Sequence, residues 1–168
     1  MRIVFILFFS VFLAACSPDY NWREVRLGNG AVTALFPDRP ITHERTLHFS
    51  GHEIQFALTS ASVKKALFAV GVAPLPPALV ADPAAAHELA TSVIKSLYQK
   101  LGAPPPTPLP GLGETFTIHG NASGATMRLQ VQVWLTKYAL VEAAVTADGS
   151  VSPENEAAEF MRGLVLAR

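Results

Sequence analysis

Cysteine and charge are both scarce in this sequence. A single cysteine among 168 residues excludes any disulfide within the chain. Charged residues make up 15% of the chain, and 13 basic residues balance 13 acidic ones. Such a chain has no basic field with which to hold nucleic acid, so we expect no nucleic-acid partner.

Motifs for metal binding and catalysis are also missing from the sequence. No HExxH pattern and no paired cysteines are present, so we predict no zinc site at the five histidines, His43, His48, His52, His87 and His119. Ser123 stands in Gly-Asn-Ala-Ser-Gly at 120–124, one place late for the G-x-S-x-G nucleophile elbow, in a segment typical of a hairpin turn. We therefore expect no cofactor, no metal and no catalytic residue.

The first fifteen residues differ in composition from everything after them. Met1 and Arg2 provide a positive start, and residues 3–12 form an apolar run interrupted only by Ser10. That run has the length of a signal-peptide core and is too short for a membrane-spanning helix, which needs roughly 20 residues. No second apolar run of spanning length follows it. Residues 1–15 are therefore predicted to be a signal peptide.

The end of this segment resembles a bacterial lipobox. Leu13-Ala14-Ala15-Cys16 directly follows the apolar core. The resemblance implies cleavage between Ala15 and Cys16 and a diacylglyceryl group on the cysteine thiol, so membrane lipid would be a partner through acylated Cys16. The alternative is an ordinary secreted protein in which Cys16 is incidental. Acylation is favoured because it consumes an unpaired thiol that would otherwise face an oxidising compartment.

The residue after the cysteine bears on the location of the protein. By analogy with lipoprotein sorting, an aspartate there retains a lipoprotein in the inner membrane, whereas this chain has Ser17. We therefore expect a lipid-anchored protein of the cell envelope, at the outer membrane and facing the periplasm. The inner membrane is the alternative.

The remainder of the chain has the length of one domain. About 150 residues remain after the signal peptide, with 12 basic against 13 acidic residues, and this length fits a single ordinary core. We expect residues 16–29 to be a lipidated tether and residues 30–168 to be a single α+β domain. Trp22 alternates with charged residues, which is compatible with an edge strand beginning inside the tether. We expect its indole to pack against the domain, with contact to lipid head groups as the alternative.

Alternation of apolar and polar residues predicts two hairpins. A two-residue turn at Ser50-Gly51 sets the register of the first, in which Phe49 pairs with His52, Leu47 with Ile54, Arg45 with Phe56 and His48 with Glu53. The second hairpin joins strands at 115–119 and 125–135 across a turn at 121–124. Apolar strands are also expected at 66–73 and at 138–147, and the second of these is expected to be central.

Two helices are predicted, one on each side of a proline-rich connector. The first follows Asp82 as its cap and Pro83 in its first turn, and its apolar face repeats every three or four residues at Leu89, Val93, Ile94, Leu97 and Leu101. Residues 103–113 predict a stiff spacer, with a ligand for a proline-binding groove as the alternative. The second helix opens at Ser152-Pro153, with a core face of Ala157, Phe160, Met161, Leu164 and Val165.

This order of elements predicts an α+β fold, an antiparallel sheet built from hairpins and packed with two helices. With Phe36-Pro37 ending an early strand and the apolar Phe160-Met161 helix closing the chain, it resembles the PsbP-like sandwich, which occurs in several small bacterial lipoproteins. Cys16-Ser17-Pro18 and Tyr20-Asn21-Trp22-Arg23 also resemble the opening of small beta-proteobacterial lipoproteins. The resemblance implies a fold and no activity.

One aromatic residue stands out on the strand at 125–135. Trp134 falls on its polar face beside Gln132 and Gln130, where cover by a helix or by the proline connector is expected and a binding surface is the alternative. Trp134 and Trp22 are therefore the candidate interaction surface. We expect a noncatalytic binding or interaction module of the envelope, whose partner is an envelope protein or a small molecule. The alternatives are a hydrolase using Ser123 or a histidine, and a purely structural envelope-maintenance protein.

Overall fold

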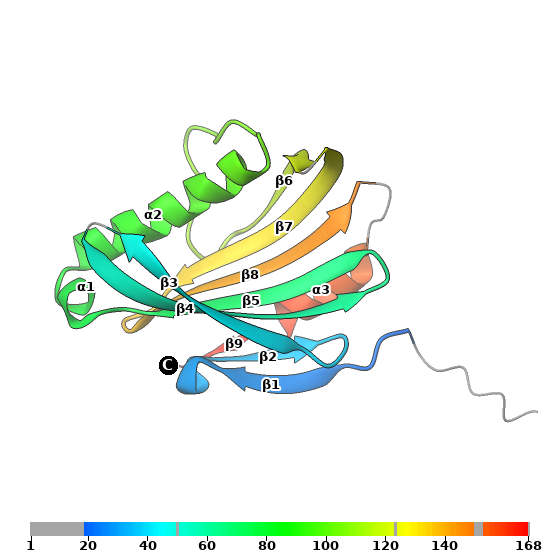
Figure 1. The fold of residues 1–168 in the computed structure, drawn as a ribbon, viewed down its shortest axis with the longest axis horizontal. Coiled ribbons are helices and arrows are strands. Elements are labelled where there is room, and N and C mark those ends of the chain that lie inside the picture. Colours follow the sequence, from blue (N-terminus) through cyan, green and yellow to red (C-terminus); the bar gives the residue numbers. More distant parts are fainter. Residues whose placement is uncertain (1–18, 50, 123, 150–152, 168) are drawn as a thin grey trace, which may run out of the picture.

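The chain forms antiparallel sheets and helices in a computed structural model, shown in Figure 1. The structure describes residues 19–49, 51–122, 124–149 and 153–167, so the predicted signal peptide, Ala15, Cys16 and Ser123 lie outside the described residues. Within those ranges no helix is both long and apolar enough to cross a membrane. The predicted α+β class with antiparallel strands is confirmed.

A six-stranded sheet forms the centre of the molecule, with strand order β3-β4-β5-β8-β7-β6. Its strands are β3 (Ile41–Phe49), β4 (His52–Val63), β5 (Ala66–Pro74), β6 (Thr115–Ala122), β7 (Ala125–Leu135) and β8 (Ala139–Asp148). Every neighbouring pair is antiparallel. The apolar strand β8 pairs with both β5 and β7, which confirms its predicted central position.

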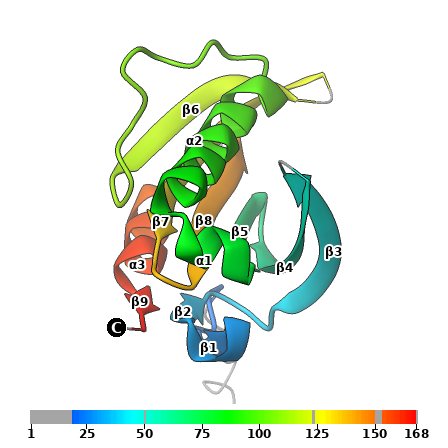
Figure 2. The same cartoon turned by 90° about the vertical axis from the view of Figure 1, so that its left-hand side faces the viewer.

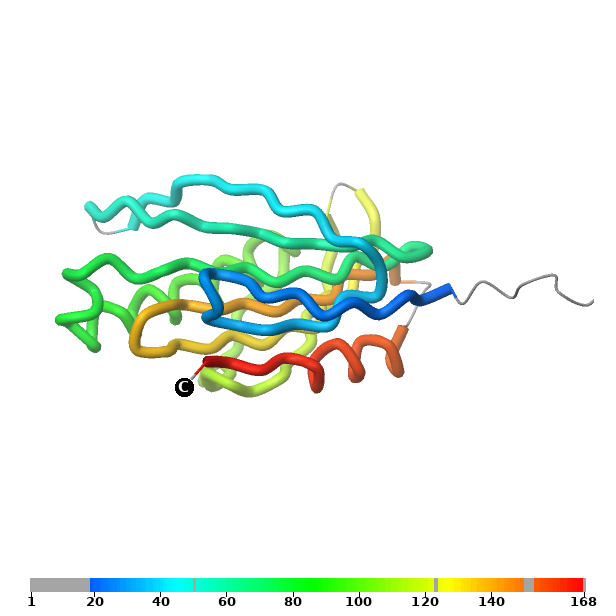
Figure 3. The backbone as a smooth tube through the Cα atoms, turned by 90° about the horizontal axis from the view of Figure 1, so that it is seen from below, coloured from blue at the N-terminus to red at the C-terminus, as the bar shows by residue number. Residues whose placement is uncertain are grey.

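A second, three-stranded sheet lies against one face of the first (Figure 3). It consists of β1 (Arg23–Leu27), β2 (Val32–Phe36) and β9 (Val165–Leu166), and a short 3₁₀ turn at Gly28–Gly30 joins β1 to β2. The sequence predicted a single sheet and placed β1 in the tether, noting only that an edge strand was compatible with it. The second sheet forms because Val32, Ala34 and Phe36 are apolar on alternate positions and bury that face completely.

The structure holds three α-helices in its described residues, where the sequence predicted two. These are α1 (Pro77–Ala81), α2 (Pro83–Lys100) and α3 (Glu154–Arg162), and the short α1 was not predicted. As predicted, Asp82 caps α2, since its carboxylate accepts hydrogen bonds from the backbone N–H groups of Ala84 and Ala85 at 3.1 Å. The prediction that Val165 belongs to the core face of the last helix was wrong. Helix α3 ends at Arg162, so Leu164 and Val165 both lie beyond it. The chain there joins the edge of β2: Val165 of β9 pairs with Thr33 of β2 and is 64% exposed, while Leu164 is partly buried against the core.

The six-stranded sheet has a hydrophobic core on each of its two faces. Helix α2 covers one face (Figures 1 and 2), where it contacts β7 and β6, and its buried residues belong to one core with Ile54 and Phe56 of β4. Helix α3 and the small sheet cover the other face, where the rings of Phe36 and Phe68 each meet Phe160 edge-to-face, with centroids 5.6 Å and 5.5 Å apart. Each of the three phenylalanines is fully buried, which contributes about 2–3 kcal/mol per side chain to folding.

Candidate functional site

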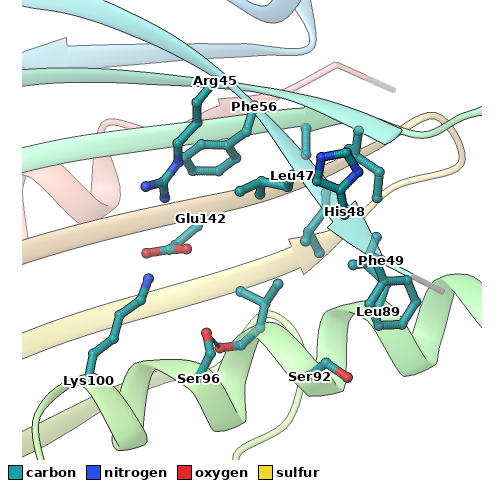
Figure 4. Close-up of a pocket in the computed structure, with 14 residues that line it drawn as sticks. Arg45, Leu47, His48, Phe49, Phe56, Leu89, Ser92, Ser96, Lys100 and Glu142 are labelled. Carbon is teal, nitrogen blue, oxygen red and sulfur yellow. Dashed lines mark hydrogen bonds between the residues drawn. The ribbon is translucent and has the colours of Figure 1, made fainter. Parts of the chain in front are cut away.

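A groove lies between the β3–β4 hairpin and helix α2. The large sheet curves so that the β3–β4 hairpin is separated from the helix (Figure 2). The cavity between them has a volume of about 280 Å³, and Figure 4 shows the side chains that line it. Its walls are Arg45, Leu47, His48 and Phe49 of β3, Ile54 and Phe56 of β4, Ala73 of β5, Leu89, Ser92, Val93, Ser96 and Lys100 of α2, and Leu140 and Glu142 of β8. This volume is just below the range of ~300–1,000 Å³ typical of small-molecule sites.

The hairpin wall of the groove follows from its predicted register. Phe49 pairs with His52, Leu47 with Ile54, Arg45 with Phe56 and His48 with Glu53, so the predicted register is confirmed. Leu47, Phe49, Ile54 and Phe56 therefore share one face and all pack toward the core beneath α2. The side chains of Leu47 and Phe49 are only half-buried, which leaves apolar surface on the groove side.

A glycine in the neighbouring strand makes room for the largest of these side chains. The ring of Phe56 occupies the space above Gly71 of β5, where a Cβ atom would lie 2.7 Å from Cε2 of the ring. The guanidinium of Arg45 lies over the same ring, with Cζ 5.1 Å from the ring centroid. The absence of a side chain at Gly71 thus allows the Phe56 ring to pack directly on β5, and the ring in turn contacts the Arg45 guanidinium.

The helical wall presents two hydroxyl groups between apolar side chains. Leu89 is buried and Val93 half-buried, and Ser92 and Ser96 lie beside them along the groove. Ser96 Oγ donates a hydrogen bond to the carbonyl oxygen of Val93 at 2.8 Å. Lys100, the last residue of α2, extends from the C-terminal end of this wall.

One carboxylate lies on the floor of the groove. Glu142 of β8 pairs with Gly71 and with Val133, so it projects from the centre of the sheet toward α2. Figure 4 shows Arg45 and Lys100 pointing toward it from opposite walls. Burial raises the pKa of Glu142 above its ordinary value, and the charges of Lys100 and Arg45 act in the opposite direction.

The carboxylate of Glu142 has no partner among the described residues. Arg45 and Lys100 point toward this carboxylate, but neither forms an ion pair with it. No fully enclosed side-chain N or O atom of the described residues lacks a hydrogen-bond partner, so the Glu142 oxygens remain in contact with the solvent of the groove. A polar group so placed is available to a ligand.

The two tryptophans of the candidate interaction surface both pack against the core beside the small sheet. Trp22 is half-buried, stacks on Tyr20 with centroids 6.1 Å apart and meets Phe68 edge-to-face. Trp134 is half-buried on the same side, and a Cβ atom built at Gly113 of the connector would lie 3.7 Å from its Cδ1. Both positions provide packing, and the interaction-surface hypothesis stays a prediction.

The histidines and Cys16 were the other residues that the sequence analysis considered. No cluster of three or more His, Cys, Asp or Glu side chains suited to a metal occurs in the part of the chain that the structure describes. His48 lines the rim of the groove, on the opposite face of the hairpin from His52. Ala15 and Cys16, the predicted cleavage and lipidation residues, lie outside the described residues.

The groove itself was not predicted from the sequence. Its strongest signal was Glu142, an acidic residue within the apolar run Ala139-Leu140-Val141-Glu142-Ala143-Ala144-Val145. An unpaired acid in a central strand is costly, so such a position indicates either a buried partner or a site. The partner helix and hairpin that enclose it are distant in sequence, and only the fold brings them together.

In comparisons with known proteins, no protein-family model, curated protein or solved structure matches this chain. The groove and the N-terminal sequence are therefore the features of this chain that bear on its function.

Proposed function

We propose that this protein is a lipid-anchored lipoprotein of the cell envelope and that its domain is a noncatalytic module that binds a small, partly apolar ligand in the groove between the β3–β4 hairpin and α2. The anchor is Cys16, acylated after cleavage behind Ala15, and the domain belongs to the PsbP-like sandwich class. The observation that carries the binding function is the half-buried apolar wall of Leu47 and Phe49 facing α2 across an open cavity.

Binding fits the groove better than catalysis does. Its lining holds two serines, but Ser96 already donates to a backbone carbonyl, and the one histidine, His48, is exposed at the rim. Nucleophilic catalysis needs a base within about 3 Å of the nucleophile, and no hydrogen bond joins a serine to a histidine among the described residues. Small-molecule sites, in contrast, are concave and mostly apolar with a few convergent polar groups, as this groove is.

The test is to fill the groove from its helical wall. The mature lipidated protein in nanodiscs is titrated with octanol by calorimetry, with protein-free nanodiscs as the blank. We expect saturable binding that Ser92→Trp weakens at least about tenfold, because the indole occupies the cavity. The matched control is Lys95→Trp on the exposed side of α2, which should bind octanol like the unmodified chain. Equal octanol binding by both tryptophan variants would contradict the proposal.

A further inference from the structure

The groove is polar at one end and apolar at the other. Figure 4 shows Arg45, Glu142 and Lys100 gathered at one end, while Phe49 and Leu89 lie at the other. Leu47 lies between the two groups, next to Phe56. A molecule that fills this space would meet charge at one end and hydrocarbon along the rest of its length.

The charged end is electropositive. Arg45 and Lys100 come from opposite walls and outnumber the single carboxylate between them. Neither cation forms an ion pair with Glu142 or with another acid among the described residues. Guanidinium and ammonium groups in this arrangement can both donate charge-assisted hydrogen bonds to one anion placed between them.

From this arrangement we infer that the groove binds a single-chain amphiphile with an anionic head group, held by Arg45 and Lys100, with its chain along Leu47, Phe49 and α2. This inference rests on the proposed binding function of the groove. The volume of about 280 Å³ suits one chain. A carboxylate and a phosphate share the required chemistry, and the experiment distinguishes them.

Glu142 favours the same ligand class over a cationic one. A cationic head group that approached the Glu142 carboxylate would also be repelled by the positive charges of Arg45 and Lys100, which weakens the binding of such a ligand. Because burial raises the pKa of Glu142, its protonated form is more accessible than that of a solvated glutamate and can donate a hydrogen bond to an anion. In that protonated form the carboxyl group adds a donor and no repulsive charge, whereas its ionised form repels an anion.

The experiment compares head groups on one chain length. The mature protein in nanodiscs of zwitterionic lipid is titrated with octanoate, octyl phosphate, octanol and octyltrimethylammonium, each against protein-free nanodiscs. We expect one or both anions to bind about tenfold more tightly than octanol, and the ammonium compound to bind no better than octanol. The stronger of the two anions identifies the head group. Inorganic phosphate alone should bind far more weakly than octyl phosphate.

Substitutions at the charged end of the groove test whether these residues cause the preference for an anionic head group. Arg45→Gln and Lys100→Gln should each weaken anion binding about fivefold or more and weaken octanol binding by a clearly smaller factor, because octanol carries no charge; Lys95→Gln on the exposed side of α2 should change neither. Glu142→Gln should keep or tighten anion binding, since the amide still donates and carries no charge. Weaker anion binding by Glu142→Gln, together with tight binding of the ammonium compound, would overturn the inference in favour of a cation site.

The outcomes separate this inference from the function on which it rests. Octanol binding that Ser92→Trp abolishes, combined with no preference for an anionic head group, would leave the groove a binding site and reject the ligand class. No saturable binding of any eight-carbon probe would reject both.

Discussion

At the scale of single residues, Glu142 is the most unusual group in the structure. It lies in a central strand, its carboxylate has no hydrogen bond or ion pair among the described residues, and burial raises its pKa. Burial without a partner disfavours the charged form, so this residue lowers stability at neutral pH. A carboxyl group that lowers folding stability at the floor of a groove is better explained by a role in ligand binding than by a role in stabilising the fold.

The pH dependence of stability tests this view of Glu142. Below its ordinary pKa of 4.5 the group is protonated in both folded and unfolded chains, so it costs no stability. As the pH rises from there through the raised folded pKa, the unfolded chain binds fewer protons than the folded chain, and stability is lost. Glu142→Gln should therefore be more stable than the unmodified protein at pH 7, and the advantage should vanish near pH 4.

Urea unfolding of both chains between pH 4 and pH 8 measures that difference. The other titratable groups lining the groove, Arg45, His48 and Lys100, are common to both chains, so they largely cancel. A stability difference that stays constant with pH would show that the carboxyl group does not titrate differently in the folded state.

At the scale of elements, the groove exists because a hairpin and a helix approach the same sheet face without closing on each other. The register of β3 and β4 places Arg45 and Phe56 side by side, and Gly71 of β5 leaves space beneath the phenylalanine ring. The cap at Asp82 sets where α2 begins, and Lys100 ends it beside Glu142. Three elements thus contribute the charged end of one site.

Gly71→Ala tests the packing of the hairpin over β5. The new methyl group would collide with the buried ring of Phe56, so we expect a loss of about 1–3 kcal/mol in the free energy of unfolding, measured in urea. In the background of Phe56→Leu, which removes the ring, the same substitution should cost clearly less. Equal costs in the two backgrounds would show that Phe56 is not the residue that requires glycine here.

At the scale of the whole molecule, the N-terminal segment is held at one end of the sheet. Asp19 Oδ2 lies 2.9 Å from Lys64 Nζ in the β4–β5 turn, and the Lys64 ammonium lies 5.7 Å from the ring centroid of Tyr20. The ion pair is exposed to solvent and contributes little to stability by itself. The stacked rings of Tyr20 and Trp22 on Phe68 provide the larger apolar contact.

This attachment predicts how the domain stands on a membrane if Cys16 is acylated. Three residue steps separate Cys16 from Asp19, at most ~11 Å of extended chain, so the β4–β5 turn would stay near the bilayer. The β3–β4 turn is at the other end of β4, which is 12 residues long and so spans roughly 36 Å. The apolar end of the groove would therefore face away from the anchoring membrane.

Fluorescent labels at the two ends of β4 test both the anchor and the orientation. In nanodiscs that carry a quencher on the lipid head groups, a dye at Lys65→Cys should be quenched several-fold more than one at Glu53→Cys, both exposed positions. The chain without an added cysteine should not react with the dye, because acylation has consumed the Cys16 thiol. Labelling of that chain would refute the anchor, and equal quenching at the two sites would refute the orientation.

Local patterns were sufficient to predict most elements and one register. The hairpin at 42–60 was predicted pair by pair, because a two-residue turn and a period of two leave one register that places Leu47 and Ile54 on the core face. The helix after Asp82 and the central position of β8 were also predicted correctly, since capping and burial on both faces leave local signals. The lipid anchor at Cys16 is likewise a matter of sequence alone and stays a prediction.

Only the tertiary structure decided where these elements meet. The small sheet, the strand at Val165–Leu166 and the groove all depend on contacts between segments far apart in the chain, which no local period records. Glu142 was not singled out from the sequence either, although an acid within an apolar strand is a local signal, whereas nothing local connects Arg45 and Lys100 to it. The sequence alone therefore predicts most of the elements and the anchor, while the charged groove exists only because packing brings β3 and α2 beside a carboxylate of β8.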